Sequence, residues 1–320
     1  MKAVFLDFAT MGEGLDLSPL TDVVPDLEVW DATGSADVAG RVTGKALVFT
    51  NKNVLSGALL SAAPEVRFIG LTATGTDNVD LDFARANDIA VANIRAYCTA
   101  SLAEHVFGTM LMLTHNLEAY RKSVAAGEWQ RASDPFLLAH PIRELAGMRL
   151  GIVGYGELGR GVARIAEAFG MELLIAARPG AETVPPGRVA FDDVLCRADV
   201  ITLHCPLTEA TRKLFGSREF EAMKQSALLI NTARGGLVDS AALAEALAGG
   251  DIAGAAVDVL PEEPPKAGDP LLDYLAAGGR NLIVTPHVAW ASAEARQNAI
   301  DELALNAAAF LRGEKRCRVV

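Results

Sequence analysis

Short apolar runs rich in β-branched residues alternate along the chain with longer, alanine-rich runs that have helical spacing. The longer runs predict helices, for example over residues 101–125, 157–169 and 241–248. Strands that alternate with helices are typical of parallel sheets covered by helices and joined by right-handed crossovers. The strands are predicted at residues 3–6, 46–49, 67–71, 90–92, 149–153, 173–176, 200–203, 227–231, 254–258 and 282–285.

The alternation falls into two sets, which predicts an α/β protein with two Rossmann-like, doubly wound parallel-sheet domains and a cleft between them. The first set ends near Ala92, and the second begins at Arg149. The last helical run, residues 293–311, has no strand after it, so we expect it to fold back onto the first domain. The prediction is a discontinuous substrate-binding domain of residues 1–99 and 290–320, and a dinucleotide-binding Rossmann domain of residues 100–289.

A glycine motif opens the second set, in the segment GIVGYGELGRGVAR. A predicted strand runs into Gly154, Gly156 and Gly159, and a predicted helix follows. The first glycine permits a tight turn, the second lets the backbone approach a pyrophosphate, and the third lets the helix pack close to the strand. Backbone N–H groups at the helix start, at Glu157 and Leu158, would then face the phosphates. The alternative is a glycine-rich turn in an ordinary βαβ unit.

The next predicted strand should end beside the adenosine ribose, where an acid usually accepts hydrogen bonds from the 2′-hydroxyl of NAD. Here the tip residue is Ala177 and Arg178 follows it, while Glu172 opens the strand at its far end. An arginine beside an absent carboxylate suits a 2′-phosphate, and one charge-assisted contact is worth roughly 1.5–3 kcal/mol. We therefore predict NADP as the preferred cofactor, with NAD also accepted. The alternative is a solvated surface arginine and a relaxed cofactor choice.

Composition narrows the class of protein. The chain has 320 residues, 51% of them hydrophobic, which fits about two globular domains. A net charge of −11 argues against a nucleic-acid surface. Asp7 interrupts the first apolar run too early for a signal peptide, and no uninterrupted apolar run reaches the roughly 18 residues of a membrane span. Cys98, Cys196, Cys205 and Cys317 fit no zinc pattern. We expect a cytoplasmic protein with reduced thiols, no metal, and no nucleic-acid or membrane partner.

Three segments downstream of the glycine motif carry charged or titratable residues after apolar strands. They hold Arg234, then Asp258 with Glu263, and then His287. Open α/β folds place their sites at the carboxyl ends of the strands. A cation, a carboxylate and an imidazole are therefore predicted on one rim of the second sheet. The alternatives are a helix-capping arginine, a structural histidine, and a solvated glutamate at either position of the Glu262-Glu263 pair.

Five motifs, in order along nearly the whole chain, resemble those of the D-isomer-specific 2-hydroxyacid dehydrogenases: GYGELGRGVAR, HCPLTEATRKLF, INTARGGLVD, DVLPEEPP and TPHVAWAS. The segment YCTASLAEHVFG and Trp290 resemble the glycerate dehydrogenase and hydroxypyruvate reductase branch of that family. The resemblance implies two Rossmann-like domains and hydride transfer between a nicotinamide and a small 2-keto acid. It also implies a homodimer, for which the long stretch of residues 100–147 would serve as the dimerisation arm.

The chemistry of the reaction gives each residue of the rim a role. His287 can supply the proton that a developing alkoxide needs, since imidazole titrates near neutral pH. Glu263 would orient His287, and its negative charge would stabilise the imidazolium. Arg234 would hold the substrate carboxylate and polarise the carbonyl.

The family resemblance adds contacts for the substrate and the cofactor. It places Asp258 under the nicotinamide, and it offers the backbone N–H groups of Thr74 and Gly75, and the side chain of Lys52, to the substrate. His105 lies inside a predicted helix, and we expect it to serve packing rather than chemistry. The remaining residues that the resemblance places against the cofactor are Thr99, Cys205, Pro206, Thr211, Thr232, Ala233, His287 and Ala289.

The predicted function is the NAD(P)H-dependent reduction of hydroxypyruvate or glyoxylate to D-glycerate or glycolate, with His287 as proton donor. One alternative is a dehydrogenase for another small acid such as D-lactate. A second alternative is a non-catalytic protein that binds the cofactor as a sensor. Neither partner-binding extensions nor a broken set of catalytic residues, which that second alternative predicts, is found in the sequence.

Overall fold

The computed structural model describes residues 1–181 and 183–320, which form two compact units. The first unit comprises Met1–Cys98 with Trp290–Val320, and the second comprises Thr99–Ala289. Thr99, which the predicted division assigns to the first domain, is the first residue of helix α5 in the second unit. Its hydroxyl donates a hydrogen bond to Glu157 Oε1 at 3.1 Å, which fastens it there. The binding roles predicted for the two units remain predictions.

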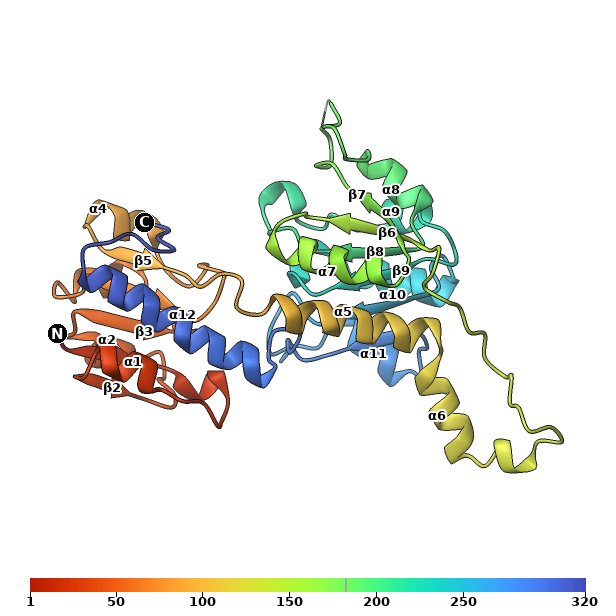
Figure 1. The fold of residues 1–320 in the computed structure, drawn as a ribbon, viewed down its shortest axis with the longest axis horizontal. Helices are drawn as coiled ribbons and strands as arrows, with labels where there is room; N and C mark the ends of the chain where they lie inside the picture. The colour runs from red at the N-terminus through yellow and green to blue at the C-terminus, as the bar shows by residue number, and fades with distance from the viewer. Residues whose placement is uncertain (182) are drawn as a thin grey trace. The chain divides into compact units, whose positions relative to one another are not determined.

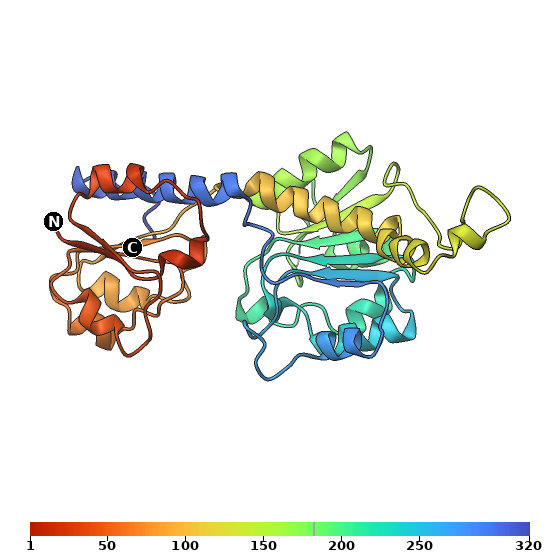
Figure 2. The same ribbon diagram turned by 90° about the horizontal axis from the view of Figure 1, so that it is seen from below.

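The first unit contains a five-stranded sheet in the order β2-β1-β3-β4-β5, and every pairing is parallel. Strand β1 lies between β2 and β3, with Ala3 opposite both Leu27 and Leu47. Strands β1, β3, β4 and β5 are fully buried because helices cover both faces of the sheet (Figures 1 and 2), whereas the edge strand β2 is largely exposed. Their bounds are β1 Ala3–Phe5, β2 Leu27–Val29, β3 Leu47–Thr50, β4 Phe68–Leu71 and β5 Ala90–Ala92.

Two apolar clusters fill the spaces between this sheet and its helices. Helices α1 (Ser18–Val23) and α12 (Ala293–Leu311) lie side by side on one face, as Figure 2 shows. Gly70 on β4 allows α12 to approach closely, since a Cβ there would come within 2.7 Å of Leu303. The opposite face is covered by α2 Val38–Val42, α3 Gly57–Ser61 and α4 Leu81–Ala86.

The second unit contains a six-stranded parallel sheet in the order β11-β10-β9-β8-β6-β7. Strand β6 lies between β7 and β8, with Leu150 opposite both Leu173 and Val200. The predicted fold class, two doubly wound parallel sheets, is confirmed. The strands are β6 Arg149–Val153, β7 Glu172–Ile175, β8 Val200–Leu203, β9 Leu228–Asn231, β10 Gly254–Val257 and β11 Leu282–Val284.

Helices α5 and α7 pack on one face of this sheet, and α8 to α11 pack on the other. Helix α5 can lie close to α7 because Gly161 has no side chain; a Cβ there would lie 2.4 Å from Thr99 Cγ2. The bounds are α5 Thr99–Thr114, α7 Glu157–Ala168, α8 Phe191–Arg197, α9 Ser217–Ala222, α10 Ser240–Gly249 and α11 Pro270–Ala276.

The helix predicted over residues 101–125 is broken into α5 and α6 (Leu117–Ala125). The break falls at Asn116, which has a left-handed backbone with φ of 49°. Asparagine tolerates this conformation better than most residues, and here its Nδ2 also donates to the carbonyl of Pro141 at 2.7 Å. From α6 onward the chain projects away from the sheet as an arm before it returns to β6 (Figure 1).

Two kinds of feature are absent from the described part of the chain. Within residues 1–181 and 183–320, none of the helices combines the length and the apolar character needed to cross a membrane. Within the same ranges, no three His, Cys, Asp or Glu side chains are grouped so that they could hold a metal ion.

Candidate active site

The three glycines between β6 and α7 serve different purposes. Gly154 has φ of +98°, and a Cβ there would lie 2.5 Å from the backbone of His204 and Cys205. A Cβ at Gly159 would lie 2.2 Å from the carbonyl oxygen of Gly154. A Cβ at Gly156, by contrast, would have no atom within 4 Å. The outer glycines are therefore required for packing, whereas the middle one leaves the backbone open to a ligand.

The N-terminus of α7 follows directly on this open glycine. Gly156 is the N-cap residue and has no side chain with which to satisfy the first-turn N–H groups, which include those of Glu157 and Leu158. The helix dipole makes such an end favourable for a negative charge. Together with the open approach at Gly156, this fits the pyrophosphate of a dinucleotide.

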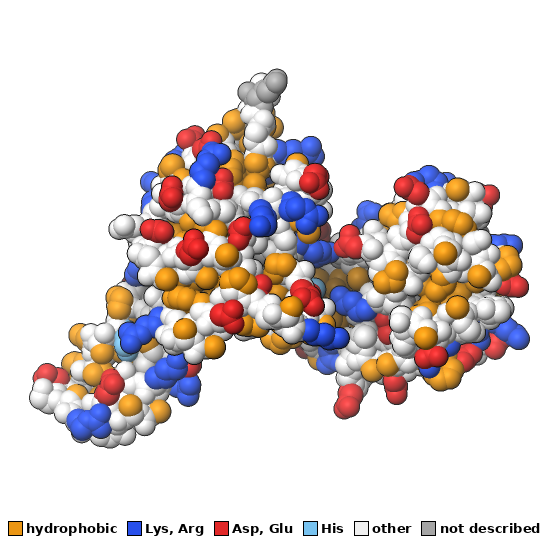
Figure 3. All heavy atoms as spheres, turned by 180° about the vertical axis from the view of Figure 1, so that it is seen from behind, with side chains coloured by type: hydrophobic (Ala, Val, Ile, Leu, Met, Phe, Trp, Pro, Cys, Tyr) orange, Lys and Arg blue, Asp and Glu red, His pale blue; other side chains and the backbone are white. Residues whose placement is uncertain are grey.

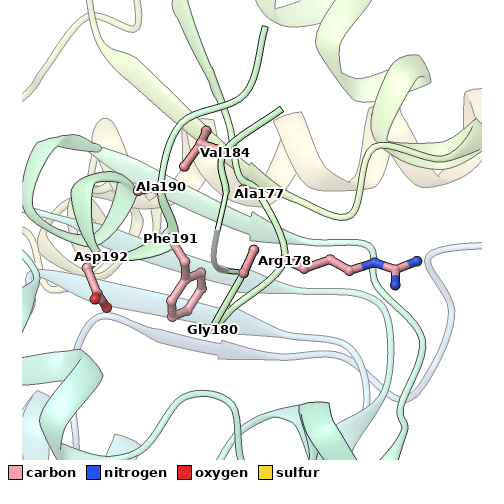
Figure 4. Close-up of a pocket in the computed structure, with 8 residues that line it drawn as sticks. Ala177, Arg178, Gly180, Val184, Ala190, Phe191 and Asp192 are labelled. Carbon is pink, nitrogen blue, oxygen red and sulfur yellow. The ribbon is translucent and has the colours of Figure 1, made fainter. Parts of the chain in front are cut away.

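A pocket of about 140 Å³ lies beyond the carboxyl end of β7 (Figure 4). Ala177 is buried at the tip of the strand, and Arg178 is exposed, with a side chain that extends away from Phe191 and Asp192 in Figure 4. Asp192, which was not predicted from the sequence, is an acid in the pocket wall and is ion-paired with Arg218 at 3.1 Å. The lining residues are Ala177, Arg178, Gly180, Ala181, Val184, Ala190, Phe191 and Asp192.

A second cation near the glycine loop was also missed. The guanidinium carbon of Arg188 lies 5.1 Å from the centre of the Tyr155 ring, and Tyr155 stands between the first two glycines of the motif. This distance is typical of a cation–π contact. Neighbouring Val189 is held beside β7 by hydrogen bonds to Ile175 and Ala177, at 2.8 Å each. Nothing in the spacing of the sequence indicates that Arg188 would reach Tyr155.

The segment after β8 lies against the glycine loop. Burial lowers the pKa of His204 to about 4, so its imidazole is neutral near pH 7, and its Nε2 lies 2.9 Å from Thr202 Oγ1. Burial raises the pKa of the Cys205 thiol, which favours the uncharged form. Thr211, predicted to contact the cofactor, donates its hydroxyl to the carbonyl of Pro206 at 2.8 Å. Thr211 therefore shapes the turn that carries Pro206.

Arg234 follows β9 in a turn that Asn231 holds in place. The buried Asn231 side chain accepts from the N–H of Ala233 at 3.1 Å and donates to the carbonyl of Arg234 at 3.0 Å. Arg234 Nη1 donates to the carbonyl of Ala233 at 2.8 Å. The hydroxyl of Thr232 is buried, and no partner for it is found among the described residues. An orphaned buried hydroxyl beside the turn is suited to a polar group of a bound ligand.

The turn that holds Arg234 also contacts the loop that carries Glu263. A Cβ at Gly235 would lie 2.0 Å from the backbone carbon of Leu260, so only glycine allows this approach. Glu263 Oε1 accepts from the N–H of Leu260 at 2.9 Å, which fixes the carboxylate at one end. The positions of Arg234 and Glu263 are thus coupled through the backbone of the second unit.

Glu263 and His287 form a close pair. Glu263 Oε2 lies 2.6 Å from His287 Nδ1, and each side chain is about one-third exposed, 34% and 32% respectively. Of the adjacent glutamates Glu262 and Glu263, Glu263 makes this contact. Because Nδ1 faces the carboxylate, Nε2 is the ring nitrogen that can exchange a proton with a substrate.

Asp258 organises the loop that carries His287. The residue is 2% exposed, and its carboxylate accepts from the N–H of Val288 and of Ala289, each at 2.9 Å. Its carbonyl accepts from the N–H of His287 at 2.8 Å. His287 has a left-handed backbone, with φ of 58°, which costs an ordinary residue roughly 1–2 kcal/mol. Asp258 therefore acts on the backbone around His287.

The structure brings Arg234, Asp258, Glu263 and His287 together beyond the carboxyl ends of β9, β10 and β11. The glycine loop and α7 follow β6, and the pocket lies beyond β7; both strands are part of the same six-stranded sheet. The second unit thus combines an open glycine loop at a helix N-terminus with a carboxylate–imidazole pair at the strand ends.

The predicted substrate contacts Lys52, Thr74 and Gly75 lie in the first unit, beyond the carboxyl ends of β3 and β4. The carboxylate of Asp7 holds the Lys52 loop by accepting from the N–H groups of residues 51, 52 and 53 at 2.9, 2.7 and 3.1 Å. Thr74 is tied to its neighbours through its carbonyl, which accepts from Asn93 Nδ2 at 2.7 Å. These contacts order the backbone and leave the substrate roles of Lys52, Thr74 and Gly75 as predictions.

A parallel sheet with this glycine loop, an open helix N-terminus and an acid–base pair defines an oxidoreductase that uses a nicotinamide dinucleotide. Comparison with known proteins agrees: residues 107–289 match the family described as D-isomer specific 2-hydroxyacid dehydrogenase, NAD binding domain. The chain belongs to this family, whose members act on the CH–OH group of 2-hydroxy acids.

Relatives match over almost the full length. A glycerate dehydrogenase of Methylorubrum extorquens is 42% identical over 316 residues, which cover 98% of this chain and 97% of the relative. A hydroxypyruvate reductase of Blautia hydrogenotrophica is 34% identical and is covered to 98%, as is this chain. Among solved structures, the TT0316 protein of Thermus thermophilus has a TM-score of 0.85 at 30% identity, with 100% of both chains covered.

Proposed function

We propose that the protein reduces a small 2-keto acid, hydroxypyruvate or glyoxylate, to the corresponding D-2-hydroxy acid or glycolate. The observation that carries this proposal is the 2.6 Å contact between Glu263 and His287, on the same sheet as the glycine loop. The similarity to proteins named glycerate dehydrogenase and hydroxypyruvate reductase favours these substrates. When bound, a nicotinamide cofactor would supply the hydride for the carbonyl carbon of the keto acid.

The protein's own residues handle the proton and the substrate charge. As negative charge develops on the carbonyl oxygen, His287 donates its Nε2 proton to that oxygen and becomes neutral. Glu263 keeps the remaining proton on Nδ1 through the 2.6 Å contact. Arg234 pairs with the substrate carboxylate and polarises the carbonyl. Lys52, Thr74 and Gly75 complete the proposed substrate contacts.

The proposed cofactor is NADP in preference to NAD. Support comes from the pocket beyond β7, where Ala177 replaces the usual acid and Arg178 stands exposed at the rim. Arg188 adds a second positive charge near the glycine loop. The acid in the pocket wall, Asp192, is offset by its ion pair with Arg218. The N–H groups at Gly156 to Gly159 would hold the phosphates of the same molecule, and Asp258 would lie under its nicotinamide. The other residues proposed to contact the cofactor are Thr99, Cys205, Pro206, Thr211, Thr232, Ala233, His287 and Ala289.

The arm that begins at α6, together with the exposed Met112 near the end of α5, is the proposed surface for a homodimer. Seven large apolar side chains are exposed between positions 112 and 142, and Phe136 and Leu138 reach 73% and 84% exposure. On the face shown in Figure 3, apolar side chains lie among charged ones along this arm. Soluble monomers rarely leave such a concentration of apolar surface uncovered. The seven residues are Met112, Leu117, Val124, Trp129, Phe136, Leu138 and Ile142.

The arm is ordered by its own contacts, which suits a surface that must meet a partner. Tyr120 donates its hydroxyl to the carbonyl of His140 at 2.7 Å, and Ser123 Oγ lies 3.1 Å from His140 Nε2. Changing Phe136 and Leu138 together to Asp is expected to yield monomers, measured by sedimentation equilibrium. A dimer of unchanged stability in that double variant would remove the proposal for this surface.

A cytoplasmic location is part of the proposal. It rests on the four cysteines, all of which are free thiols in the structure, since a reducing compartment keeps such thiols reduced.

The experiment that tests the function is a panel of small 2-keto acids, each assayed with NADPH and with NADH. We expect the highest kcat/KM with hydroxypyruvate or glyoxylate and NADPH, and the D-isomer of glycerate as product. Pyruvate as the best substrate would move the assignment to a D-lactate dehydrogenase. If purified protein binds NADPH and turns over none of the acids, a cofactor-sensing protein would replace the enzyme.

A further inference from the structure

His105 lies on α5 and makes polar contacts that the sequence pattern did not predict. Its Nε2 is 3.2 Å from Thr285 Oγ1 and 3.8 Å from Asp258 Oδ1. The side chain is 19% exposed, so these contacts are largely shielded from water. Thr285 and Asp258 directly follow β11 and β10, which places His105 beside the loop that carries His287.

The direction of each hydrogen bond between His105, Thr285 and Asp258 follows from the available protons. Thr285 Oγ1 donates to Asp258 Oδ1 at 2.5 Å, and an ionised carboxylate can only accept. A hydroxyl has one proton, so Thr285 has none left for His105. The imidazole of His105 must therefore carry a proton on Nε2 and donate it to Thr285. The geometry assigns this protonation at Nε2 to both the neutral and the cationic form of His105.

Asp258 links the hydrogen bonds from His105 and Thr285 to the loop that carries His287. Its carboxylate receives the Thr285 hydroxyl and the N–H groups of Val288 and Ala289. A buried carboxylate is costly unless such donors satisfy its oxygens. Without the Thr285 hydroxyl, Asp258 Oδ1 loses one of its two donors and keeps the N–H of Val288, so the carboxylate is oriented less firmly. His105 supports one of these donors directly and adds a favourable charge when it is protonated.

The loop around His287 depends on this hold. The N–H groups of three successive residues, His287, Val288 and Ala289, all point to Asp258. They keep the backbone of His287 at φ of 58°, a conformation that the residue would otherwise leave. The imidazole makes its 2.6 Å contact with Glu263 from this backbone conformation. A displacement of about 1 Å at a reacting group can cost on the order of 100-fold in rate.

We propose that His105 is a positioning residue, which acts through Thr285 and Asp258 to hold the backbone of His287 in its reactive conformation. The inference rests on the function proposed above for His287. It goes beyond that function because it assigns a role to a residue on α5 that touches neither of the groups between which the hydride moves.

Three variants separate this role from simple packing. His105→Leu removes the donor, His105→Gln keeps an N–H group near the position of Nε2, and Glu104→Leu places the same leucine on the exposed neighbouring position as a control. We expect His105→Leu to lower kcat about 10- to 100-fold, with the Kd for NADPH within about threefold of the wild type. His105→Gln is expected to recover most of the loss, and Glu104→Leu to behave as the wild type.

A double-mutant cycle tests whether His105 and Thr285 act through the same hydrogen bonds. Thr285→Val removes the hydroxyl that links His105 to Asp258, so it should lower kcat as His105→Leu does. The double variant should then be no slower than either single variant, because contacting residues are not additive. Multiplied losses in the double variant, equal rates for the Leu and Gln variants, or an unchanged kcat in His105→Leu would each overturn the proposal.

A structural measurement keeps the proposal independent of the function. Nitrogen-15 shifts of the His105 ring are expected to report a proton on Nε2, and the backbone amide shifts of residues 287–289 should change in His105→Leu. A proton on Nδ1 alone, or unchanged amide shifts, would contradict the positioning role. If the wild-type protein reduces no 2-keto acid, the proposed function fails, and these shifts still decide whether His105 holds the loop.

Discussion

The two parallel sheets of this molecule have a similar strand order, but they differ in what lies at the carboxyl end of the first strand. In each sheet the first strand lies between two others, β1 between β2 and β3 and β6 between β7 and β8. Open α/β sheets bind ligands outside the carboxyl end of the strands at this point. In the first unit a carboxylate, that of Asp7, fills the position and accepts four hydrogen bonds from residues 50 to 53. In the second unit the glycine loop leaves it open.

The difference shows that topology provides a position and local residues decide its use. The carboxylate of Asp7 already accepts from the backbone N–H groups of residues 51 to 53, which orders this loop, and its negative charge repels a phosphate. A glycine without a side chain, at the N-terminus of a helix of 12 residues, attracts phosphate instead. The same fold can therefore serve as a platform for Lys52 in one unit and as a dinucleotide site in the other.

The largest effect is expected from the glycine loop. Gly159→Val should prevent stable folding of the second unit, or cost about 3 kcal/mol or more, because its Cβ would lie 2.2 Å from a backbone oxygen. Gly156→Val should leave thermal unfolding unchanged and weaken NADPH binding at least 10-fold, measured by fluorescence titration. Gly40→Val, at another open position, serves as the control for the added side chain. Equal effects of the two loop substitutions would contradict the distinction between packing and ligand access.

The second effect concerns Asp7, which follows β1 in the first unit. Asp7→Ala should lower the free energy of unfolding by about 3 kcal/mol, because several donors around it lose their acceptor. Asp7→Asn keeps one acceptor and should lose less. Denaturant unfolding measures the stability, and NADPH titration should give the same Kd for all three proteins. A weakened Kd would show that Asp7 does not act on its own unit alone.

How far the sequence predicts this picture depends on the range of each contact. The glycine motif, the strands of the second sheet and the residues after them are local features, and their positions followed from spacing and apolar pattern. The roles of Asp7, Asn231 and His105 did not. Asp7 meets Thr50 across 43 positions and His105 meets Thr285 across 180, so these pairs depend on how the helices and strands pack.

Two features of the secondary structure were missed for different reasons. Strand β2, Leu27–Val29, is a short edge strand with largely exposed residues, so it has no apolar run to reveal it. The break between α5 and α6 depends on Asn116, whose left-handed backbone is supported by a carbonyl 25 positions away. An apolar periodicity that continues across such a residue predicts one helix where there are two.

The third effect concerns the pocket beyond β7 in the second unit, where Arg178 is proposed to contact a 2′-phosphate. Arg178→Gln should lower kcat/KM with NADPH about 10- to 200-fold and leave the value with NADH nearly unchanged, since one charge-assisted contact is worth roughly 1.5–3 kcal/mol. Ala177→Asp should shift the preference further towards NADH. Arg218→Gln, which frees Asp192 in the pocket wall, is expected to disfavour NADPH moderately. At least 10-fold better kcat/KM with NADH for the wild type would end the NADP assignment.

The smallest effect concerns pH and His204, beside the glycine loop. Its pKa falls from 6.5 to about 4 in the folded protein because burial disfavours the charged form. The unfolded chain therefore binds a proton that the folded chain does not, and His204 lowers stability as pH falls from 6.5 towards 4. His204→Gln should remove about 1–2 kcal/mol of the loss between pH 7 and pH 5. If the free energy of unfolding falls by the same amount between pH 7 and pH 5 in the variant and the wild type, His204 is not shielded from water.

The measurement that tests the central claim most directly is the rate of NADPH oxidation by hydroxypyruvate in His287→Asn and Glu263→Gln. The account predicts that His287→Asn loses about 10²- to 10⁴-fold in kcat, the usual contribution of a general acid, while NADPH binding is retained. Glu263→Gln should lose less, because the amide oxygen can still accept the hydrogen bond of His287 Nδ1. A His287→Asn protein that reduces hydroxypyruvate within threefold of the wild-type rate would contradict the account.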